Sequence, residues 1–343
     1  MYKPINKQTH HQDSESNLLF SKTQRFIDQH CLIKAKSTII CGFSGGPDSL
    51  FLLIFLARLA QNGLIALIAA HLDHEWQLDS DKTAQFCIDA ANRMGIKIIT
   101  QKLSELPHTL THKNGSLENM GRIARKLFFD SLYQKFNADA VALGHHLQDQ
   151  QETFFIRLIR GSSLTGLTVM KARSGHVIRP LLELHKADIV EYLVRNNIKF
   201  IHDKTNDSDS FLRNRLRKYV IPALRSCDNR FDTNFLKTIT RLQEGDEAIT
   251  AVAKRFLNQK SVVIDNQAWL PISTLLDQPI NLQHCILINY LIANKAQFNP
   301  SNRFLQEILH FLQCNKSRSH QLSDDWLLSK LNGLVAIHKR ISC

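Results

Sequence analysis

Short apolar runs alternate with longer helical patterns along the first two thirds of the chain. The run STIICGF (37–43) has the length of a buried strand, and DSLFLLIFLARLAQNG (48–63) follows it with the length and closing Asn-Gly of a helix. The same alternation continues from LIALIAAHL (64–72) to KADIVEYLVRNN (186–197). Strands that alternate with helices are typical of a parallel sheet with helices on both faces. The sequence therefore predicts an α/β domain with a doubly wound, mostly parallel sheet.

The pattern changes near residue 228, where strand signals weaken and helical periods dominate, as in FLKTITRLQEGDEAITAVAKRFL (235–257). This shift in composition is the expected domain boundary. We expect residues 17–227 to form the α/β domain, residues 228–343 to form a smaller, mainly helical domain, and residues 1–16 to be a disordered polar tail.

Composition favours a basic, globular protein with an anionic partner. The chain has 343 residues and 43% hydrophobic content, and its 43 Lys and Arg against 31 Asp and Glu give a net charge of +12. Such an excess favours nucleic acid as a partner. The seven cysteines form no C-x-x-C pair, which predicts neither a disulfide framework nor a zinc ribbon. No apolar run reaches the roughly 18 residues of a membrane span, so we expect a cytoplasmic protein without a membrane partner.

The segment FSGGPDSLFLL (43–53) joins the first predicted strand to the first predicted helix. Free backbone N–H groups and the helix dipole favour an anion at such a position, and glycines let the backbone approach a phosphate closely. A carboxylate in this loop fits a magnesium ion bound to that phosphate, whereas an ordinary turn is the alternative. The Walker and dinucleotide-binding patterns are both missing. The predicted ATP-binding residues are Ser44, Gly45, Gly46, Pro47, Asp48 and Ser49, with Asp48 as the metal ligand.

A second polar segment, GHHLQDQQETFFIRLIRG (144–161), follows another strand-like run. It carries His145 at the sheet edge where open α/β sheets bind ligands, and then Asp149 and Glu152 on one face of the next helix. The alternative is a solvated face whose carboxylates interact with the helix dipole. Because the glycine loop and HLDHEW (71–76) reach the same edge, we expect these groups to converge at a nucleotide site.

These segments resemble known motifs. SGGPDS (44–49) resembles the pyrophosphate-binding loop of the ATP-pyrophosphatase superfamily, which implies an adenine nucleotide alpha hydrolase-like fold. The tRNA(Ile)-lysidine synthetases of that superfamily show motifs similar to GRIARKLFF (121–129), to residues 144–161 and to HDKTNDSDSFLRNRLRKYVIPAL (202–224). The resemblance continues to DDWLLSKLNGLVAIHKR (324–340), in the part of the chain that corresponds to the family's substrate-binding domain.

The resemblance implies a reaction and its residues. ATP adenylates position 2 of the cytidine at the first anticodon position of tRNA(Ile) with a CAU anticodon, and free lysine then displaces AMP. Asp149 and Glu152 would orient and deprotonate the lysine, Arg125 would neutralise the α-phosphate, and His145 would bond to phosphate or base. The implied cofactors are ATP and Mg²⁺, and the implied tRNA-binding residues are Arg213, Asn214 and Arg217.

The chain departs from the family pattern at several points. Gln148 stands where an aspartate is more frequent, and Glu75-Trp76-Gln77 replaces a segment that usually carries a basic residue. We also expect the final C-terminal domain of longer members to be absent, which leaves open how methionine tRNA is rejected. The sequence leaves two other functions open, an ATP-dependent tRNA thiolase and a non-catalytic RNA-binding protein. It also leaves open the oligomeric state, a homodimer included, and a solvated helix face as the role of the basic segment.

Overall fold

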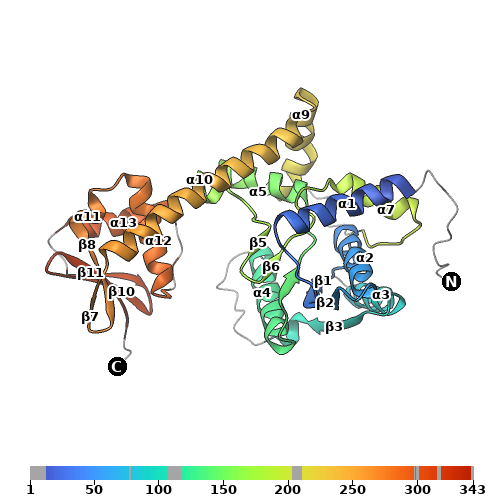
Figure 1. The fold of residues 1–343 in the computed structure, drawn as a ribbon, viewed down its shortest axis with the longest axis horizontal. Coiled ribbons are helices and arrows are strands. Elements are labelled where there is room, and N and C mark those ends of the chain that lie inside the picture. The colour runs from blue at the N-terminus through green and yellow to red at the C-terminus, as the bar shows by residue number, and fades with distance from the viewer. Residues whose placement is uncertain are drawn as a thin grey trace. The chain divides into compact units, whose positions relative to one another are not determined.

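The computed structural model describes residues 13–76, 79–106, 117–202, 211–296, 298, 301–314 and 318–340. Residues 1–12 of the predicted tail lie outside the described residues. The chain forms two compact units (Figure 1). The first unit comprises residues 1–160 and 169–236, and the second comprises residues 161–168 and 237–343. After Leu236 the chain leaves the first unit and enters the second, within the helix α10 (Phe231–Lys260). A boundary inside a helix is not marked by a shift in composition.

The first unit contains a six-stranded sheet in the order β3-β2-β1-β4-β6-β5, parallel except for β5. The predicted parallel α/β fold is therefore confirmed. Chain order reverses between β1 and β4, which is the switch point where such sheets bind ligands. The strands are β1 (Ser37–Gly42), β2 (Ile65–Asp73), β3 (Lys97–Lys102), β4 (Ala140–Ala142), β5 (Arg173–Ser174) and β6 (Val177–Ile178).

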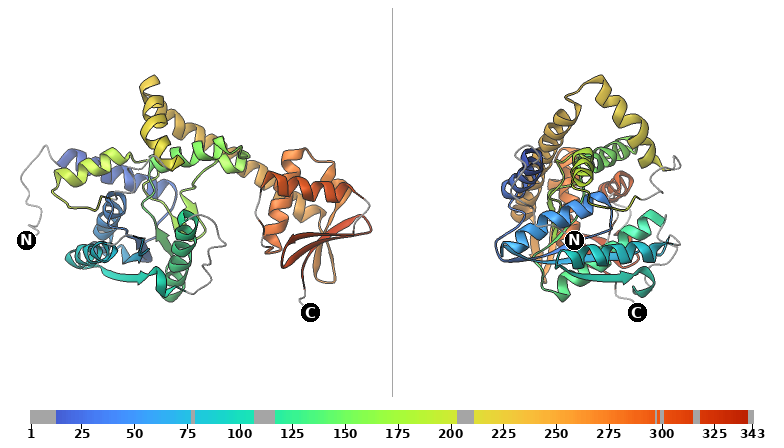
Figure 2. Two further views of the ribbon diagram at one scale, coloured as in Figure 1. Left: turned by 180° about the vertical axis from the view of Figure 1, so that it is seen from behind. Right: turned by 90° about the vertical axis from the view of Figure 1, so that its right-hand side faces the viewer.

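Helices cover both faces of this sheet (Figure 2). Successive residues of β1 point to opposite faces, so that Ile39 and Cys41 join the core around α2 while Ile40 joins the core around α4. The helical elements are α1 (Asp13–Gln29), α2 (Pro47–Gln61), α3 (Ser80–Arg93), the 3₁₀ turn η1 (Leu103–Glu105), α4 (Leu117–Lys135), α5 (Leu147–Ile159), α7 (Lys186–Arg195), α8 (Leu212–Arg215), the π-helical segment η4 (Leu216–Val220) and α9 (Ile221–Cys227).

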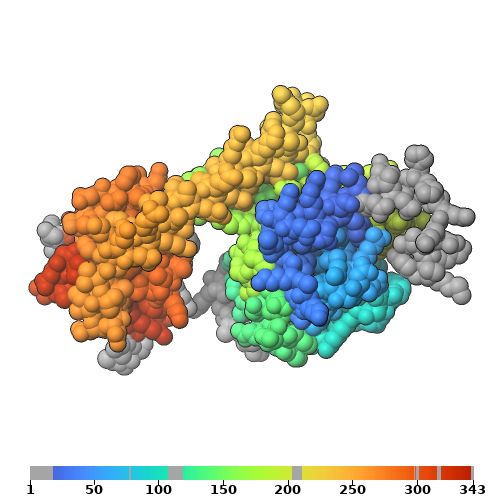
Figure 3. All heavy atoms as spheres, viewed as in Figure 1, coloured from blue at the N-terminus to red at the C-terminus, as the bar shows by residue number. Residues whose placement is uncertain are grey.

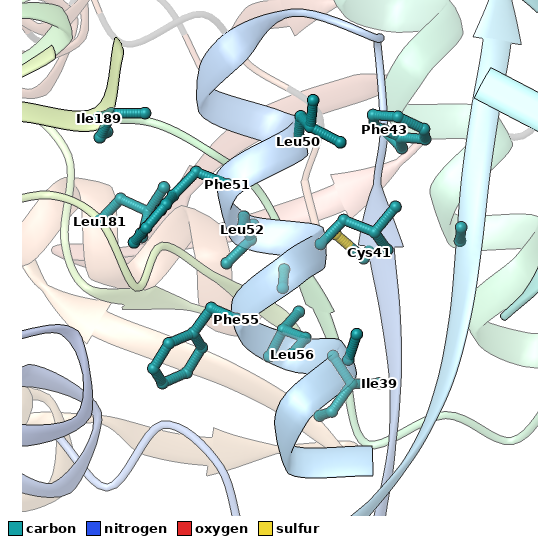
Figure 4. Packing of buried hydrophobic residues seen from close by; sticks show 14 of the residues in the cluster. Ile39, Cys41, Phe43, Leu50, Phe51, Leu52, Phe55, Leu56, Leu181 and Ile189 are labelled. Carbon is teal, nitrogen blue, oxygen red and sulfur yellow. The ribbon is translucent and has the colours of Figure 1, made fainter. Parts of the chain in front are cut away.

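Helix α2 lies at the centre of the larger core (Figure 4). It is apolar nearly all round, because β1 packs on one side and α1 and α7 cover the other. The ring of Phe51 lies 5.4 Å from Phe20 and 5.3 Å from Tyr192, and all three rings are buried. Atoms of α1 form part of the outer surface over this layer (Figure 3).

The second unit packs helices on a five-stranded antiparallel sheet in the order β7-β8-β11-β10-β9. The helices were predicted and the sheet was not. Two tight hairpin turns carry residues of positive φ, at Asp265-Asn266 and at Asn332-Gly333, and the Asn-Gly pair is a hairpin signal that the helical interpretation overlooked. The elements are α6 (Leu164–Leu167), most of α10 (Phe231–Lys260), β7 (Val262–Ile264), β8 (Gln267–Pro271), α11 (Ile272–Leu276), α12 (Ile280–Ala293), α13 (Asn302–Gln313), β9 (Ser319–Ser323), β10 (Trp326–Leu331) and β11 (Leu334–Lys339). Across the described ranges, no helix is both long enough and apolar enough to traverse a bilayer.

Candidate active site

The glycine loop connects β1 to the start of α2 and leaves the helix end open to a ligand. Gly45 has φ +82°, and a Cβ there would lie 2.9 Å from Ile201 Cδ1, so only glycine fits. Gly46 is the N-cap of α2 and offers no side chain to cap it. Ser49 Oγ accepts the Ser44 N–H and lies within hydrogen-bond distance of the Gly46 carbonyl, each at 3.1 Å. Ser49 therefore holds the loop in shape.

The segment that follows β4 touches the first turn of α2. A Cβ on Gly144 would lie 3.0 Å from both the Asp48 carbonyl carbon and the Ser49 nitrogen. This backbone contact brings the histidine segment beside the glycine loop, as expected for two loops at a switch point. The two polar segments of the sequence thus meet in space.

Asp48 lies in a small network of charges. Its Oδ2 is 3.6 Å from His146 Nε2 and 3.6 Å from Lys186 Nζ, and His146 Nε2 is 3.5 Å from Asp149 Oδ2. Burial alone would raise the pKa of Asp48, but His146 and Lys186 outweigh burial and lower that pKa. Burial would lower the pKa of His146, but the two carboxylates raise it. The His146 side chain thus lies between the carboxylates of Asp48 and Asp149.

Several buried polar atoms around this edge have no hydrogen-bond partner in the described residues. His71 Nδ1 lies 2.9 Å from the Phe43 carbonyl, which accepts its proton and leaves Nε2 without a partner. Buried polar atoms in native proteins are nearly always satisfied, so such a cluster indicates space for a polar ligand. The unpartnered atoms are Asp48 Oδ1, His71 Nε2, Asp73 Oδ2, His74 Nδ1, His145 Nδ1 and His146 Nδ1.

Arg125 lies on α4 near two of these imidazoles. Its Nε donates to the Gly121 carbonyl at 3.2 Å. Burial, together with the charge of Arg125, lowers the pKa of His74 to about 4 and that of His145 to about 4. Trp76 stacks on His74 and would meet a Cβ on Gly121, so the departure from the family pattern after Asp73 packs against α4. Arg125 is therefore near enough to His145 for its charge to lower the pKa of that imidazole.

Glu152 has a different environment from Asp149. Its side chain is fully buried, and Arg217 donates to both of its oxygens, Nε to Oε1 at 2.6 Å and Nη2 to Oε2 at 3.1 Å. Arg213 Nε lies 3.4 Å from Oε2. Burial raises the pKa of Glu152 and the Arg217 guanidinium limits the rise. The structure thus joins a predicted lysine-binding residue to two predicted tRNA-binding residues. Arg213 and Asn214 lie on α8, and Arg217 lies on η4.

Sequence reasoning missed Lys186 and the role of His146. Lys186 belongs to α7, far along the chain from the glycine loop, and no local motif marks it. Gln148 supplies the connection, because its Oε1 accepts the Lys186 backbone N–H at 2.9 Å at the start of α7. The residue that departs from the family pattern therefore helps to hold Lys186 beside Asp48.

The geometry defines a class of protein: a doubly wound α/β protein with an open helix N-terminus and a carboxylate at the sheet's switch point, where such proteins bind ligands. The model of the PP-loop domain, an ATP-binding family, matches residues 16–224. The chain belongs to the PP-loop family.

Curated relatives match much of the chain. The tRNA(Ile)-lysidine synthase of Bacillus anthracis is 31% identical over 306 residues, which are 85% of this chain and 63% of the relative. The tRNA(Ile)-lysidine synthase of Clostridioides difficile is 34% identical over 227 residues, 66% of this chain and 48% of the relative. The chain therefore spans less than two thirds of the length of these relatives.

A solved structure shares the fold. The U34-tRNA thiolase NcsA from Methanococcus maripaludis, with its [4Fe-4S] cluster, superposes with a TM-score of 0.59 at 15% identity. The superposition covers 68% of this chain and 80% of that chain. At this identity the likeness concerns the fold alone.

The contact at Gly144 generates a first prediction. Gly144→Ala should weaken ATP binding by about tenfold or more, the equivalent of ~1.4 kcal/mol, because the new Cβ pushes the backbone of the glycine loop. Gly245→Ala is the matched control: nothing lies within 4 Å of its Cβ, so it should leave ATP binding unchanged and stabilise α10 by about 1 kcal/mol. Calorimetric titration with ATP measures both. Equal ATP affinities of the two variants would show that ATP binding does not require glycine at position 144.

His145 gives a prediction on pH. Its pKa is lowered from 6.5 to about 4, so below pH 6.5 the unfolded chain binds a proton that the folded protein accepts only near pH 4. The free energy of unfolding should fall across this window as the pH falls. In urea unfolding, the slope of the free energy of unfolding against pH should be smaller in His145→Asn. The difference should correspond to about one proton, or ~1.4 kcal/mol per pH unit. An identical slope in the variant would show that His145 titrates normally.

Proposed function

We propose that this chain attaches lysine to position 2 of the cytidine at the first anticodon position of tRNA(Ile) with a CAU anticodon. The product is lysidine, the intermediate is adenylated tRNA, and pyrophosphate and AMP are released. The observation that carries the proposal is the extent of similarity to lysidine synthases, which at 85% of the chain exceeds the PP-loop domain. The cytoplasm, where ATP and tRNA occur together, is the proposed location.

The glycine loop would bind the departing pyrophosphate. Its open helix N-terminus offers backbone N–H groups to phosphate oxygens, and Lys186 adds a cation beside Asp48. Mg²⁺ fits at Asp48, because Oδ1 is buried without a protein partner and a single carboxylate with phosphate oxygens is a usual magnesium environment. When bound, the ion would neutralise phosphate charge. Among the described residues, no group of three His, Cys, Asp or Glu could hold a metal without such help.

Arg125 and His145 would act on the adenylation step. The guanidinium of Arg125 would stabilise negative charge that develops on the α-phosphate. His145 is neutral at physiological pH because its pKa lies near 4, so it would bond to phosphate or base through a neutral imidazole. Its Nδ1 is buried and has no hydrogen-bond partner among the described residues, so Nδ1 would form that bond.

Asp149 would deprotonate the lysine ammonium. An ammonium has no lone pair, so a proton must leave before the nitrogen attacks C2; the new C–N bond forms as the C–O bond to AMP breaks. Asp149 lies beside His146 at the same edge and would accept that proton. Glu152 was assigned the same role from the sequence, but guanidinium groups contact both of its oxygens, which favours a positioning role.

The thiolase alternative is disfavoured by the cysteines. Cys41 and Cys87 are buried, and burial raises the pKa of both thiols, which opposes their use as sulfur carriers. The described cysteines form no cluster with metal-ligating neighbours. A non-catalytic RNA-binding protein would gain nothing from the unpartnered polar atoms around Asp48. The homodimer stays a prediction.

Incubation with tRNA(Ile) transcript, ATP and labelled lysine tests the proposal. We expect label in the tRNA and a mass increase that corresponds to lysine at the anticodon cytidine. Asp48→Asn should abolish AMP formation with little loss of stability, because the residue lies in the first turn of α2 and the substitution keeps its shape and removes only a charge. Sulfur in the product, or adenylation by Asp48→Asn at the wild-type rate, would contradict this assignment.

Substitution of Asp149 should lower lysine transfer, whereas substitution of Glu152 should lower stability. Asp149→Asn keeps an acceptor for the His146 N–H and should lower lysine transfer by about 100-fold while pyrophosphate release continues. Glu152→Gln leaves Arg217 without its carboxylate and should cost about 3–5 kcal/mol of stability. Glu191→Gln, which breaks an exposed ion pair, is the control. Urea unfolding and single-turnover assays separate the two effects; unchanged stability of Glu152→Gln would rule out the positioning role.

A further inference from the structure

The segment 211–220, made of α8 and η4 with Phe211 before them, has two faces of different character. On its inner face Leu216 is buried, and Arg213 and Arg217 contact Glu152 of α5. Glu152 follows Asp149 by three residues on the same helix. The inner arginines are therefore occupied in holding the segment against the candidate active site.

The outer face carries exposed aromatic and basic side chains. Phe211 is 56% exposed and Tyr219 is 52% exposed, and Arg215 and Lys218 are exposed as well. The only other exposed Phe, Tyr or Trp among the described residues is Trp76, which stacks on His74. Two of the three exposed aromatic rings thus lie on one short segment, which marks it as a binding surface.

Charge and local geometry agree on the kind of partner. Lys218 Nζ lies 5.1 Å from the centre of the Tyr219 ring, and no acidic residue occurs from 211 to 227. Cations attract a phosphate backbone, and exposed rings offer stacking for bases that are not already paired. η4 is a π-helical stretch, a distortion that is frequent at functional sites.

We propose that the outer face of this segment, formed by Phe211, Arg215, Lys218 and Tyr219, is a stacking surface for unpaired nucleotides of an RNA loop. The proposal rests on the proposed function and refines it. Arg213 and Arg217 anchor the segment from inside, and the outward residues contact the RNA. One helix diameter, about 10–12 Å, separates the two faces.

Binding of a fluorescent anticodon stem-loop RNA to the full chain, without ATP or lysine, tests the surface. Tyr219→Ala should weaken binding by about tenfold with an unchanged salt slope, whereas Tyr219→Phe should bind like the wild type. Lys218→Ala should lower the salt slope by about one, and Lys82→Ala, an exposed lysine on α3, should not. A duplex RNA of equal length should bind all Tyr219 variants equally.

Wild-type affinity of Tyr219→Ala, or an equal loss for duplex RNA, would overturn the stacking surface. Since this assay contains no lysine, its result does not depend on whether lysidine is formed. If lysine is attached to tRNA by Tyr219→Ala with wild-type kcat/KM at limiting tRNA, the surface is wrong while the proposed function stands. If the binding losses occur but no lysine is attached by the wild type, the surface stands and the function is wrong.

Discussion

The burial of helix α2 on nearly all sides is the constraint on which the first unit depends. A helix with few polar positions has to be covered, and β1, α1 and α7 together provide the cover. Once α2 is enclosed, its N-terminus can open only at the carboxyl edge of the sheet. The glycine loop, Asp48 and the contact with Gly144 are all placed by that enclosure, which explains why a ligand site lies at the end of the most apolar element.

Charge at the site is arranged around one imidazole. His146 is 2% exposed and burial would lower its pKa, yet the pKa is raised because Asp48 and Asp149 face the same nitrogen. His145, its neighbour in sequence, is held neutral by burial and by nearby guanidinium groups. The pKa values of two adjacent histidines are therefore shifted in opposite directions, raised for His146 by two carboxylates and lowered for His145 by burial.

The sequence predicted the parallel fold, the glycine loop and the edge at which the polar segments meet, because strand length, helical period and turn chemistry are local signals. It did not predict partners that lie far apart in the chain. Arg217 and Glu152 are 65 residues apart, and nothing in either local pattern indicates the other. Lys186 was missed for the same reason. The antiparallel sheet was missed although Asn332-Gly333 carried a hairpin signal, because the surrounding helical patterns dominated the interpretation.

The pair of arginines on Glu152 also fixes a rotation. Arg213 and Arg217 are four residues apart, one helical turn, and both reach the same carboxylate, so the segment that carries them cannot turn about its own axis without breaking one contact. Apolar packing alone would tolerate such a turn more easily. The direction in which Phe211 and Tyr219 point is therefore set by a buried glutamate on another helix. Scanning mutagenesis would register Glu152 as a contact for any ligand of those rings, although the two never meet.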